Sequence, residues 1–266
     1  LSDTGWDEAM AGCTYVIHVA SPFVMAEPKD EKELITPAVD GTRRVVQAAQ
    51  RAGVSRLVLT SSIFAMIAGK DSGRYGPDSW SDTDANIGAY SKSKTLAERA
   101  AWDINGNDTM ELTVINPGGV SGPPLSAQAD SSSVAMMSDM INGKMPMLPD
   151  LALNMVDVRD VARLHVTALT APQAAGRRFI AATSEPVEFV TTAAILKQAG
   201  YSKVSTRKAP TVVLRLMSLF SREAKAMLPM LGKKIVLDTT STSEILEWQP
   251  TSMEDSVMDM AASLSK

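Results

Sequence analysis

Cysteine and histidine, two residues that commonly bind transition metals, are nearly missing from this sequence. One cysteine, Cys13, and two histidines, His18 and His165, stand among 266 residues. A lone cysteine excludes an internal disulfide and, in its apolar stretch, fits the core of a protein from a reducing compartment. Two separate histidines without a ligand cluster do not complete a zinc site, so we predict no metal and assign His18 to the core or to a loop.

Long apolar runs and basic clusters are missing too. No apolar run approaches the roughly 18 residues of a membrane span, and the first residues lack a signal-peptide pattern. The net charge is −4 without a basic cluster, which argues against nucleic acid as the main partner. With 45% hydrophobic residues the chain has enough apolar surface for a full core. We therefore expect a cytoplasmic globular protein that binds a small molecule and neither a membrane nor a nucleic acid.

The sequence does contain an alternation of strand and helix patterns. Residues 14–20 are β-branched and almost uncharged, which predicts a buried strand, and Gly53 follows a helical pattern at a position that favours a left-handed residue. This order predicts βαβ units, and hence a parallel sheet with right-handed crossovers. The expected strands are 14–20, 56–60, 112–115 and 178–182, and the expected helices are 6–11, 36–52, 90–104 and 158–168.

Beyond Gly122 the pattern loosens, and much of the high methionine count falls there. Further helices are expected at 134–141, 187–199, 211–229 and 252–264. We predict an α/β fold, with a Rossmann-like parallel sheet that has helices on both faces and a smaller, mostly helical substrate-binding region. The domains would be 1–122, a partial dinucleotide-binding domain, and 123–266, a cap from which 156–182 returns to the core.

A tyrosine and a lysine four residues apart, Tyr90 and Lys94, form the main candidate for chemistry. Residues at i and i+4 lie on one helical face, and a nearby cation favours the phenolate, bringing the phenol pKa toward neutral pH. Ser62 follows the strand 56–60 and could hold a carbonyl oxygen. Three expected strand ends, at 20–21, 61–62 and 117–118, would meet at one edge of the sheet, where ligands of such folds bind.

These motifs resemble the extended short-chain dehydrogenase/reductases of the NAD-dependent epimerase/dehydratase superfamily. Within that group, the chain is most similar to the branch that contains dihydroflavonol 4-reductase and cinnamoyl-CoA reductase. The segments that carry the resemblance are His-Val-Ala-Ser-Pro at 18–22, Val-Leu-Thr-Ser-Ser at 58–62, Tyr-Ser-Lys-Ser-Lys-Thr-Leu-Ala-Glu at 90–98, Asn-Pro-Gly-Gly-Val-Ser-Gly-Pro at 116–123 and Val-Asp-Val-Arg-Asp-Val-Ala at 156–162.

The resemblance implies a reductase that converts an aldehyde or ketone to an alcohol by hydride transfer from NADP(H), preferred here over NAD(H). Tyr90 would be the general acid, Lys94 would lower its pKa and hold the ribose, and Ser62 would bind the substrate oxygen. The residues implied for the cofactor are Ala20, Ser21, Thr60, Tyr90, Lys94, Pro117, Gly118 and Val120. Those expected at the substrate are Ser62, Phe23 and Ile67.

Three departures from the family pattern bear on this assignment. The family opens with a strand, a Gly-rich phosphate loop and a helix, whereas this sequence opens at Leu1 inside a helical pattern, so we expect an N-terminal portion to be missing. Ala38 stands where extended members carry an asparagine that supports a proton-relay water. Ile67 stands where dihydroflavonol reductases tend to carry a polar asparagine, which argues against a flavonoid substrate.

Two other functions stay open at this point. A sugar-nucleotide epimerase or dehydratase would use the same scaffold, although a dehydratase would usually place acidic residues beside the catalytic serine, where Ile63 and Phe64 stand. A homologue that senses a cofactor or binds a partner without catalysis is the second alternative. Extended family members often dimerise through two helices per subunit, which here would be those near 37–52 and 90–104.

Overall fold

Four parallel strands form the central sheet of the computed structural model, which describes residues 2–22, 27–106, 110–126, 131–218, 220 and 228–265. The strands lie in the order β1, β2, β4, β8. Their bounds are Tyr15–His18, Arg56–Thr60, Glu111–Pro117 and Arg178–Ala181. All three pairings are parallel, so each connection crosses over the sheet. The α/β fold predicted from the alternation of patterns is confirmed.

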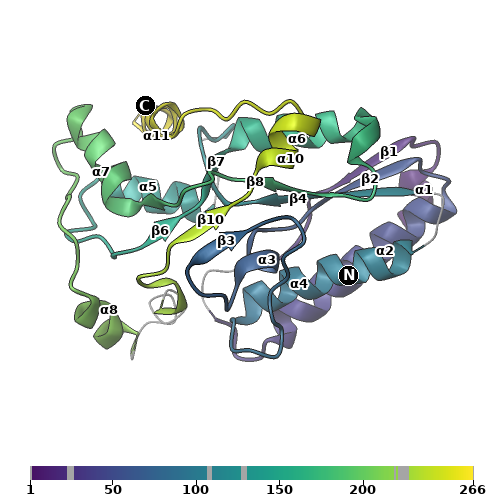
Figure 1. Cartoon of the computed structure of the whole chain (residues 1–266), viewed down its shortest axis with the longest axis horizontal. Helices are drawn as coiled ribbons and strands as arrows, with labels where there is room; N and C mark the ends of the chain where they lie inside the picture. Colours follow the sequence, from purple (N-terminus) through teal and green to yellow (C-terminus); the bar gives the residue numbers. More distant parts are fainter. Residues whose placement is uncertain are drawn as a thin grey trace.

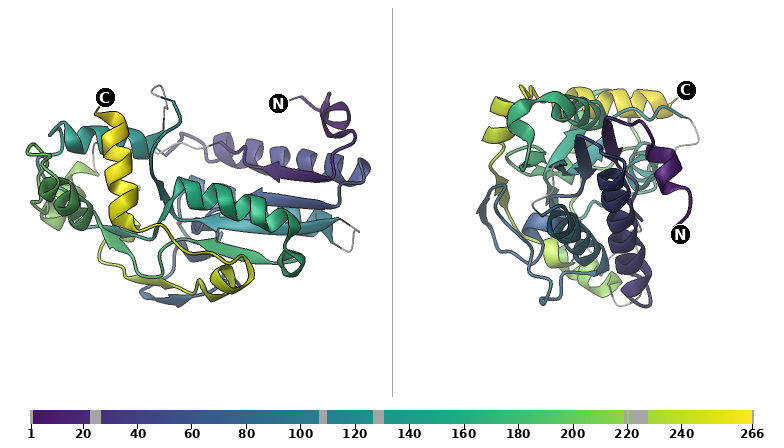
Figure 2. Two further views of the ribbon diagram at one scale, coloured as in Figure 1. Left: turned by 90° about the horizontal axis from the view of Figure 1, so that it is seen from above. Right: turned by 90° about the vertical axis from the view of Figure 1, so that its right-hand side faces the viewer.

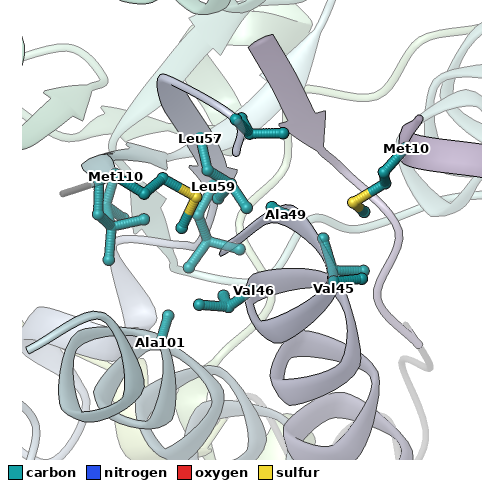
Figure 3. Packing of buried hydrophobic residues seen from close by; sticks show 12 residues of the cluster. Met10, Val45, Val46, Ala49, Leu57, Leu59, Ala101 and Met110 are labelled. Carbon is teal, nitrogen blue, oxygen red and sulfur yellow. The ribbon is translucent and has the colours of Figure 1, made fainter. Parts of the chain in front are cut away.

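Helices cover the sheet on both faces, which explains the unbroken apolar run Leu57–Leu59 in β2. The helices α2, α4 and α6 span Lys32–Arg51, Ala89–Asn105 and Val158–Thr170. Figure 1 shows α2 and α4 below the sheet and α6 above it. Leu57 and Leu59 pack with Val46 on the α2 and α4 side (Figure 3), whereas Val58 packs on the α6 side. Alternate residues of a strand face opposite sides, so a strand buried on both faces needs an unbroken apolar run.

Strand β1 corrects one prediction, because it is not buried. It pairs only with β2 among the described residues, and it is therefore an edge strand. Its alternate residues Tyr15, Ile17 and Val19 are 43%, 40% and 61% exposed, while Val16, on the opposite face, packs against the cluster under α2. Apolar composition predicted burial on both faces, but α6 contacts β2, β4 and β8 and leaves this face of β1 open.

The second half adds a helical cap at the carboxyl ends of the strands. Helices α5, α7 and α11 span Ser132–Ile141, Phe189–Gln198 and Met253–Leu264. They share an apolar core in which Met137, Met140 and Met260 are buried, and they gather at one end of the sheet (Figures 1 and 2). Of the expected helix 211–229, α8 covers Thr211–Met217 and ends before Ser218; 219 and 221–227 lie outside the described residues.

Among the described residues, six short strands escaped prediction because each has only two or three residues. They form the pairs β3–β10, β5–β7 and β6–β9. Their bounds are Gly73–Tyr75, Gly119–Ser121, Ala152–Leu153, Met155–Asp157, Val187–Glu188 and Ile235–Leu237. The remaining helical segments are α1 (Trp6–Met10), α3 (Phe64–Ile67), η1 (Pro172–Ala174), η2 (Leu228–Met230) and α10 (Thr240–Ile245). None of the helices in the described ranges has the length and apolar character needed to cross a membrane.

The turn from β4 to β5 depends on close packing at Gly118. A Cβ atom at this position would lie 2.2 Å from the carbonyl oxygen of Asn154 and 2.9 Å from the Cβ of Ala182. The first is a backbone oxygen and the second is the side-chain carbon of a buried alanine, so neither can move aside cheaply. The glycine therefore lets β5 pass close to the segment before β7.

We expect Gly118→Ala to lower the free energy of unfolding by about 1–3 kcal/mol or more, as overpacking does in cores. Gly76→Ala is the matched control, because its Cβ would make an ordinary contact of 3.7 Å with Asp238 and should change stability by less than about 0.5 kcal/mol. Urea denaturation followed by circular dichroism measures both. Equal stability of the two variants would contradict the packing described here.

Candidate active site

Helix α4 carries the tyrosine and the lysine of the expected site in its first two turns. It begins after Gly88, whose φ is 80°, and the Glu27 carboxylate accepts a hydrogen bond of 3.2 Å from the N–H of Ala89. A carboxylate here satisfies a free helical N–H and interacts favourably with the helix dipole. One turn apart, Tyr90 and Lys94 share a face, and the Lys94 Nζ lies 5.9 Å from the centroid of the Tyr90 ring.

Ser62 reaches the same place from the end of β2. Its Oγ accepts a 3.2 Å hydrogen bond from the N–H of Phe64, and its hydroxyl is hydrogen-bonded to the Tyr90 side chain. The Phe64 ring packs edge-on against the Tyr90 ring, with centroids 6.1 Å apart. The structure thus brings together Ser62, Tyr90 and Lys94, which the sequence separates by up to 32 positions.

Burial shifts both ionisable groups of this cluster toward their neutral forms. It raises the pKa of Tyr90, and the hydrogen bond with Ser62 opposes that shift only in part. It lowers the pKa of Lys94 to about 8, against the opposing charge of Glu98. The expectation that the phenol pKa falls is therefore wrong for this structure, because desolvation disfavours the phenolate more than its surroundings favour it. At neutral pH the tyrosine is a protonated acid beside a charged lysine.

A pocket opens beside Lys94, at the carboxyl ends of β1 and β2. It is lined by His18, Ala20, Ser21, Thr42, Leu59, Thr60, Ser61, Lys94, Ala97 and Glu98. Four of the residues expected at the cofactor therefore line one small pocket, whose walls carry hydroxyl, imidazole and ammonium groups. His18 was assigned to the core or to a loop; it is buried, lines this pocket, and has a pKa lowered to about 4 by burial and by Lys94.

The other residues expected at the cofactor lie at the end of β4. The carbonyl of Pro117 accepts a 3.0 Å hydrogen bond from the N–H of Ile63, and the N–H of Gly118 donates to the carbonyl of Ala181 at 3.0 Å. Val120 is half-buried in β5. These contacts place the turn next to the Ser62 segment, but they do not test a cofactor contact, which stays a prediction.

The two substrate residues named besides Ser62 have different outcomes. Phe23 lies outside the described residues. Ile67 is only 9% exposed and packs in α3 with Met66 and Leu237, so most of its surface is used by the core. Its contact with a substrate stays a prediction.

A buried carboxylate, Glu98, ties this region together, and no pattern in the sequence assigned it a role. Ser61 Oγ donates to it at 2.5 Å, Asn116 Nδ2 at 3.0 Å and Arg178 Nε at 2.5 Å. Arg178 stacks on the Trp80 ring, with its guanidinium carbon 3.9 Å from the centroid. Glu98 stands inside a motif that carried the resemblance, but its partners are up to 80 residues away and could not be read from spacing.

A second long-range contact fixes the end of β2 on the α6 side. Thr60 Oγ lies 2.6 Å from His165 Nε2, and His165 Nδ1 lies 2.7 Å from the carbonyl of Val161. A carbonyl can only accept, so Nδ1 carries the hydrogen, and burial lowers the pKa of His165. The ring is therefore neutral, and the Thr60 hydroxyl donates to Nε2.

The position that carries a relay asparagine in other members is apolar here. Ala38 is buried in α2 and offers no side-chain hydrogen bond. One turn later, Thr42 brings a hydroxyl to the pocket beside Lys94. No group of three or more metal-binding side chains occurs within the described ranges.

Comparison with known proteins places the chain in a family. A family model described as "NAD dependent epimerase/dehydratase family" matches residues 1–182. The chain is 37% identical over 179 residues to cinnamoyl-CoA reductase 1 of Arabidopsis thaliana, covering 65% of this chain and 51% of that protein. It is 35% identical over 190 residues to a putative NADPH-dependent methylglyoxal reductase of Candida albicans, covering 64% of this chain and 56% of that protein. The chain thus spans about half the length of these curated relatives.

Among solved structures, the fold matches yeast methylglyoxal/isovaleraldehyde reductase Gre2 in complex with NADPH. The TM-score is 0.81 at 22% identity, and the match covers 98% of this chain and 79% of that one. At this identity the likeness shows a shared fold.

Proposed function

Because the chain belongs to the NAD-dependent epimerase/dehydratase family, we propose that it is an NADPH-dependent reductase that converts an aldehyde or a ketone to an alcohol. The observation that carries the proposal is the meeting of Ser62, Tyr90 and Lys94, of which Lys94 also lines the pocket at the ends of β1 and β2. Such a cluster supplies a proton donor, a hydrogen-bond donor for a carbonyl oxygen and a cation in one place.

The protein's own groups have separate tasks in this reaction. Bound nicotinamide supplies the hydride. Tyr90 donates its phenolic proton to the carbonyl oxygen, and its raised pKa keeps that proton in place at neutral pH. Ser62 donates a hydrogen bond to the same oxygen as negative charge develops there. Lys94 keeps a positive charge beside the phenol, which stabilises the phenolate left after proton transfer.

The choice of NADPH over NADH is supported by a relative. The Candida albicans protein is named as NADPH-dependent, and the described pocket offers hydroxyls and an ammonium to the ribose and nicotinamide half of the cofactor. The same family includes epimerases and dehydratases. The reductase is favoured because Ile63 and Phe64, rather than acidic residues, follow Ser62, and because the relatives named above are reductases.

We further propose a homodimer that forms through the outer sides of α2 and α4. These two helices pack side by side on one face of the sheet, so they offer a second copy a continuous surface (Figure 1). Light scattering coupled to size-exclusion chromatography should give twice the mass of one chain, and a monomer at micromolar concentration would contradict the proposal.

The direct test of the chemistry is NADPH oxidation on mixing with a panel of aldehydes and ketones, measured by absorbance with the complete encoded protein. Tyr90→Phe should lower kcat by roughly 10²–10⁴-fold, because it removes the general acid and little else. Tyr15→Phe is the control, since this exposed tyrosine lies at the start of β1 and should leave kcat unchanged. Equal turnover by the Tyr90 variant would refute the mechanism.

The pH dependence of reduction should report Lys94. Since its pKa is about 8, we expect kcat/KM to be level near pH 7 and to fall as the pH rises through about 8 and the ammonium loses its proton. In Lys94→Arg the cation stays charged, so this alkaline limb should move to higher pH whatever the residual rate. A limb that stays near pH 8 in the arginine variant would assign the titration to another group.

A further inference from the structure

Glu98 lies between the two parts of the proposed site. Its side chain is fully buried on α4, one turn beyond Lys94, and it also lines the pocket. The catalytic helix therefore carries, within nine residues, the phenol, the ammonium and a carboxylate. A carboxylate this deeply buried is stable only with strong partners.

The carboxylate reaches Ser62 through two short links. Asn116 Nδ2 lies 3.0 Å from Glu98 Oε2 and 3.1 Å from the carbonyl oxygen of Ser62, so one amide group bridges the helix and the serine. Ser61, which precedes Ser62 in the chain, donates its hydroxyl to Glu98 Oε2 at 2.5 Å. The backbone on both sides of the Ser61–Ser62 peptide is thus held to α4, the helix that bears Tyr90.

The charge of Glu98 also acts on Lys94. The titratable groups that face the Lys94 ammonium are His18 from β1, and Tyr90 and Glu98 from α4. His18 is neutral at neutral pH. The negatively charged group near Lys94 in this set is therefore Glu98, which also forms an ion pair with Arg178 from β8.

We propose that Glu98 is a positioning residue of the reductase site: through Asn116 and Ser61 it sets the distance between Ser62 and Tyr90, and it places a carboxylate one helical turn from the Lys94 ammonium. The proposal rests on the proposed function for its kinetic consequences. It gives Glu98 an effect on catalysis, which a purely structural ion pair with Arg178 would not have.

If Glu98 only stabilised the fold, its replacement would leave kcat and the alkaline limb of the pH profile unchanged. Replacing Glu98 together with Arg178 tests this. Glu98→Gln alone leaves the Arg178 guanidinium buried without a counter-charge, and the variant could fail to fold. The double variant Glu98→Gln/Arg178→Met removes both charges and keeps similar volumes. Glu98→Asp keeps the charge and shortens the tether by one methylene group.

We expect the double variant to fold with a lower melting temperature, because the introduced methionine cannot donate to the carbonyls of Pro77 and Ser79, and to have a kcat lower by roughly 10–100-fold when measured below that temperature, as misplaced catalytic groups do. The KM for NADPH should change by less than about threefold, and the alkaline limb should move to lower pH. Glu98→Asp should have a lower kcat than the wild type, while the alkaline limb of its pH profile should stay at the wild-type pH. Glu111→Gln, which removes the exposed partner of Arg56 at the far end of β4, is the control and should change neither. Wild-type kcat and limb position in the double variant would overturn the proposal.

A measurement without turnover separates this inference from the proposed function. Carbon-13 NMR of lysine labelled at Cε, with Lys94 assigned by its loss in Lys94→Met, should give a pKa near 8 in the wild type and a lower one in the double variant. An unchanged pKa would overturn the charge role even if the enzyme is active. If the wild type reduces no carbonyl compound but the pKa shifts as expected, the proposed function fails and the Glu98–Lys94 coupling stands.

Discussion

The ion pair between Glu98 and Arg178 is the interaction on which this end of the fold depends. Both side chains are buried, and removing two charges from water costs several kcal/mol per ion, so the pair is stable only if most of its hydrogen-bonding groups find partners. They do. Arg178 Nη1 donates to the carbonyls of Pro77 and Ser79 at 2.6 Å each, and its guanidinium stacks on Trp80. One charge pair thereby holds β8, α4 and the loop after β3 in a single arrangement.

Burial away from water makes the Glu98–Arg178 pair costly to form, and it also sets the pKa values of the acid and base groups in the site. A parallel sheet brings the ends of β1, β2 and β4 to one edge, and the start of helix α4 lies beside them. Groups held there lose water, so the pKa of Tyr90 rises while that of Lys94 falls. The fold therefore places the protonated Tyr90 next to Lys94, whose pKa of about 8 is close to neutral pH. The chemistry follows from burial as much as from the identity of the side chains.

The sequence predicted the parts of the molecule that depend on local patterns. Apolar periodicity gave the four main strands and the order of the long helices, and the spacing of Tyr90 and Lys94 gave their shared face. It could not give contacts between distant residues: Thr60 with His165 and Glu98 with Arg178 depend on the packing of elements about 80–105 positions apart. The apolar residues of β1 predicted that it is buried, which was wrong. Burial also depends on which helix lies over a strand, and this cannot be read from residue type.

The open edge of β1 has a consequence for where the sheet can be extended. Along this edge the backbone N–H and C=O groups lack strand partners among the described residues, and Tyr15, Ile17 and Val19 present an apolar row beside them. An unpaired edge with an apolar face is a template on which another chain can add a strand. Among the described strands of this sheet, β1 therefore has backbone groups open to a further strand, whereas β2 and β4 already have a strand on each side.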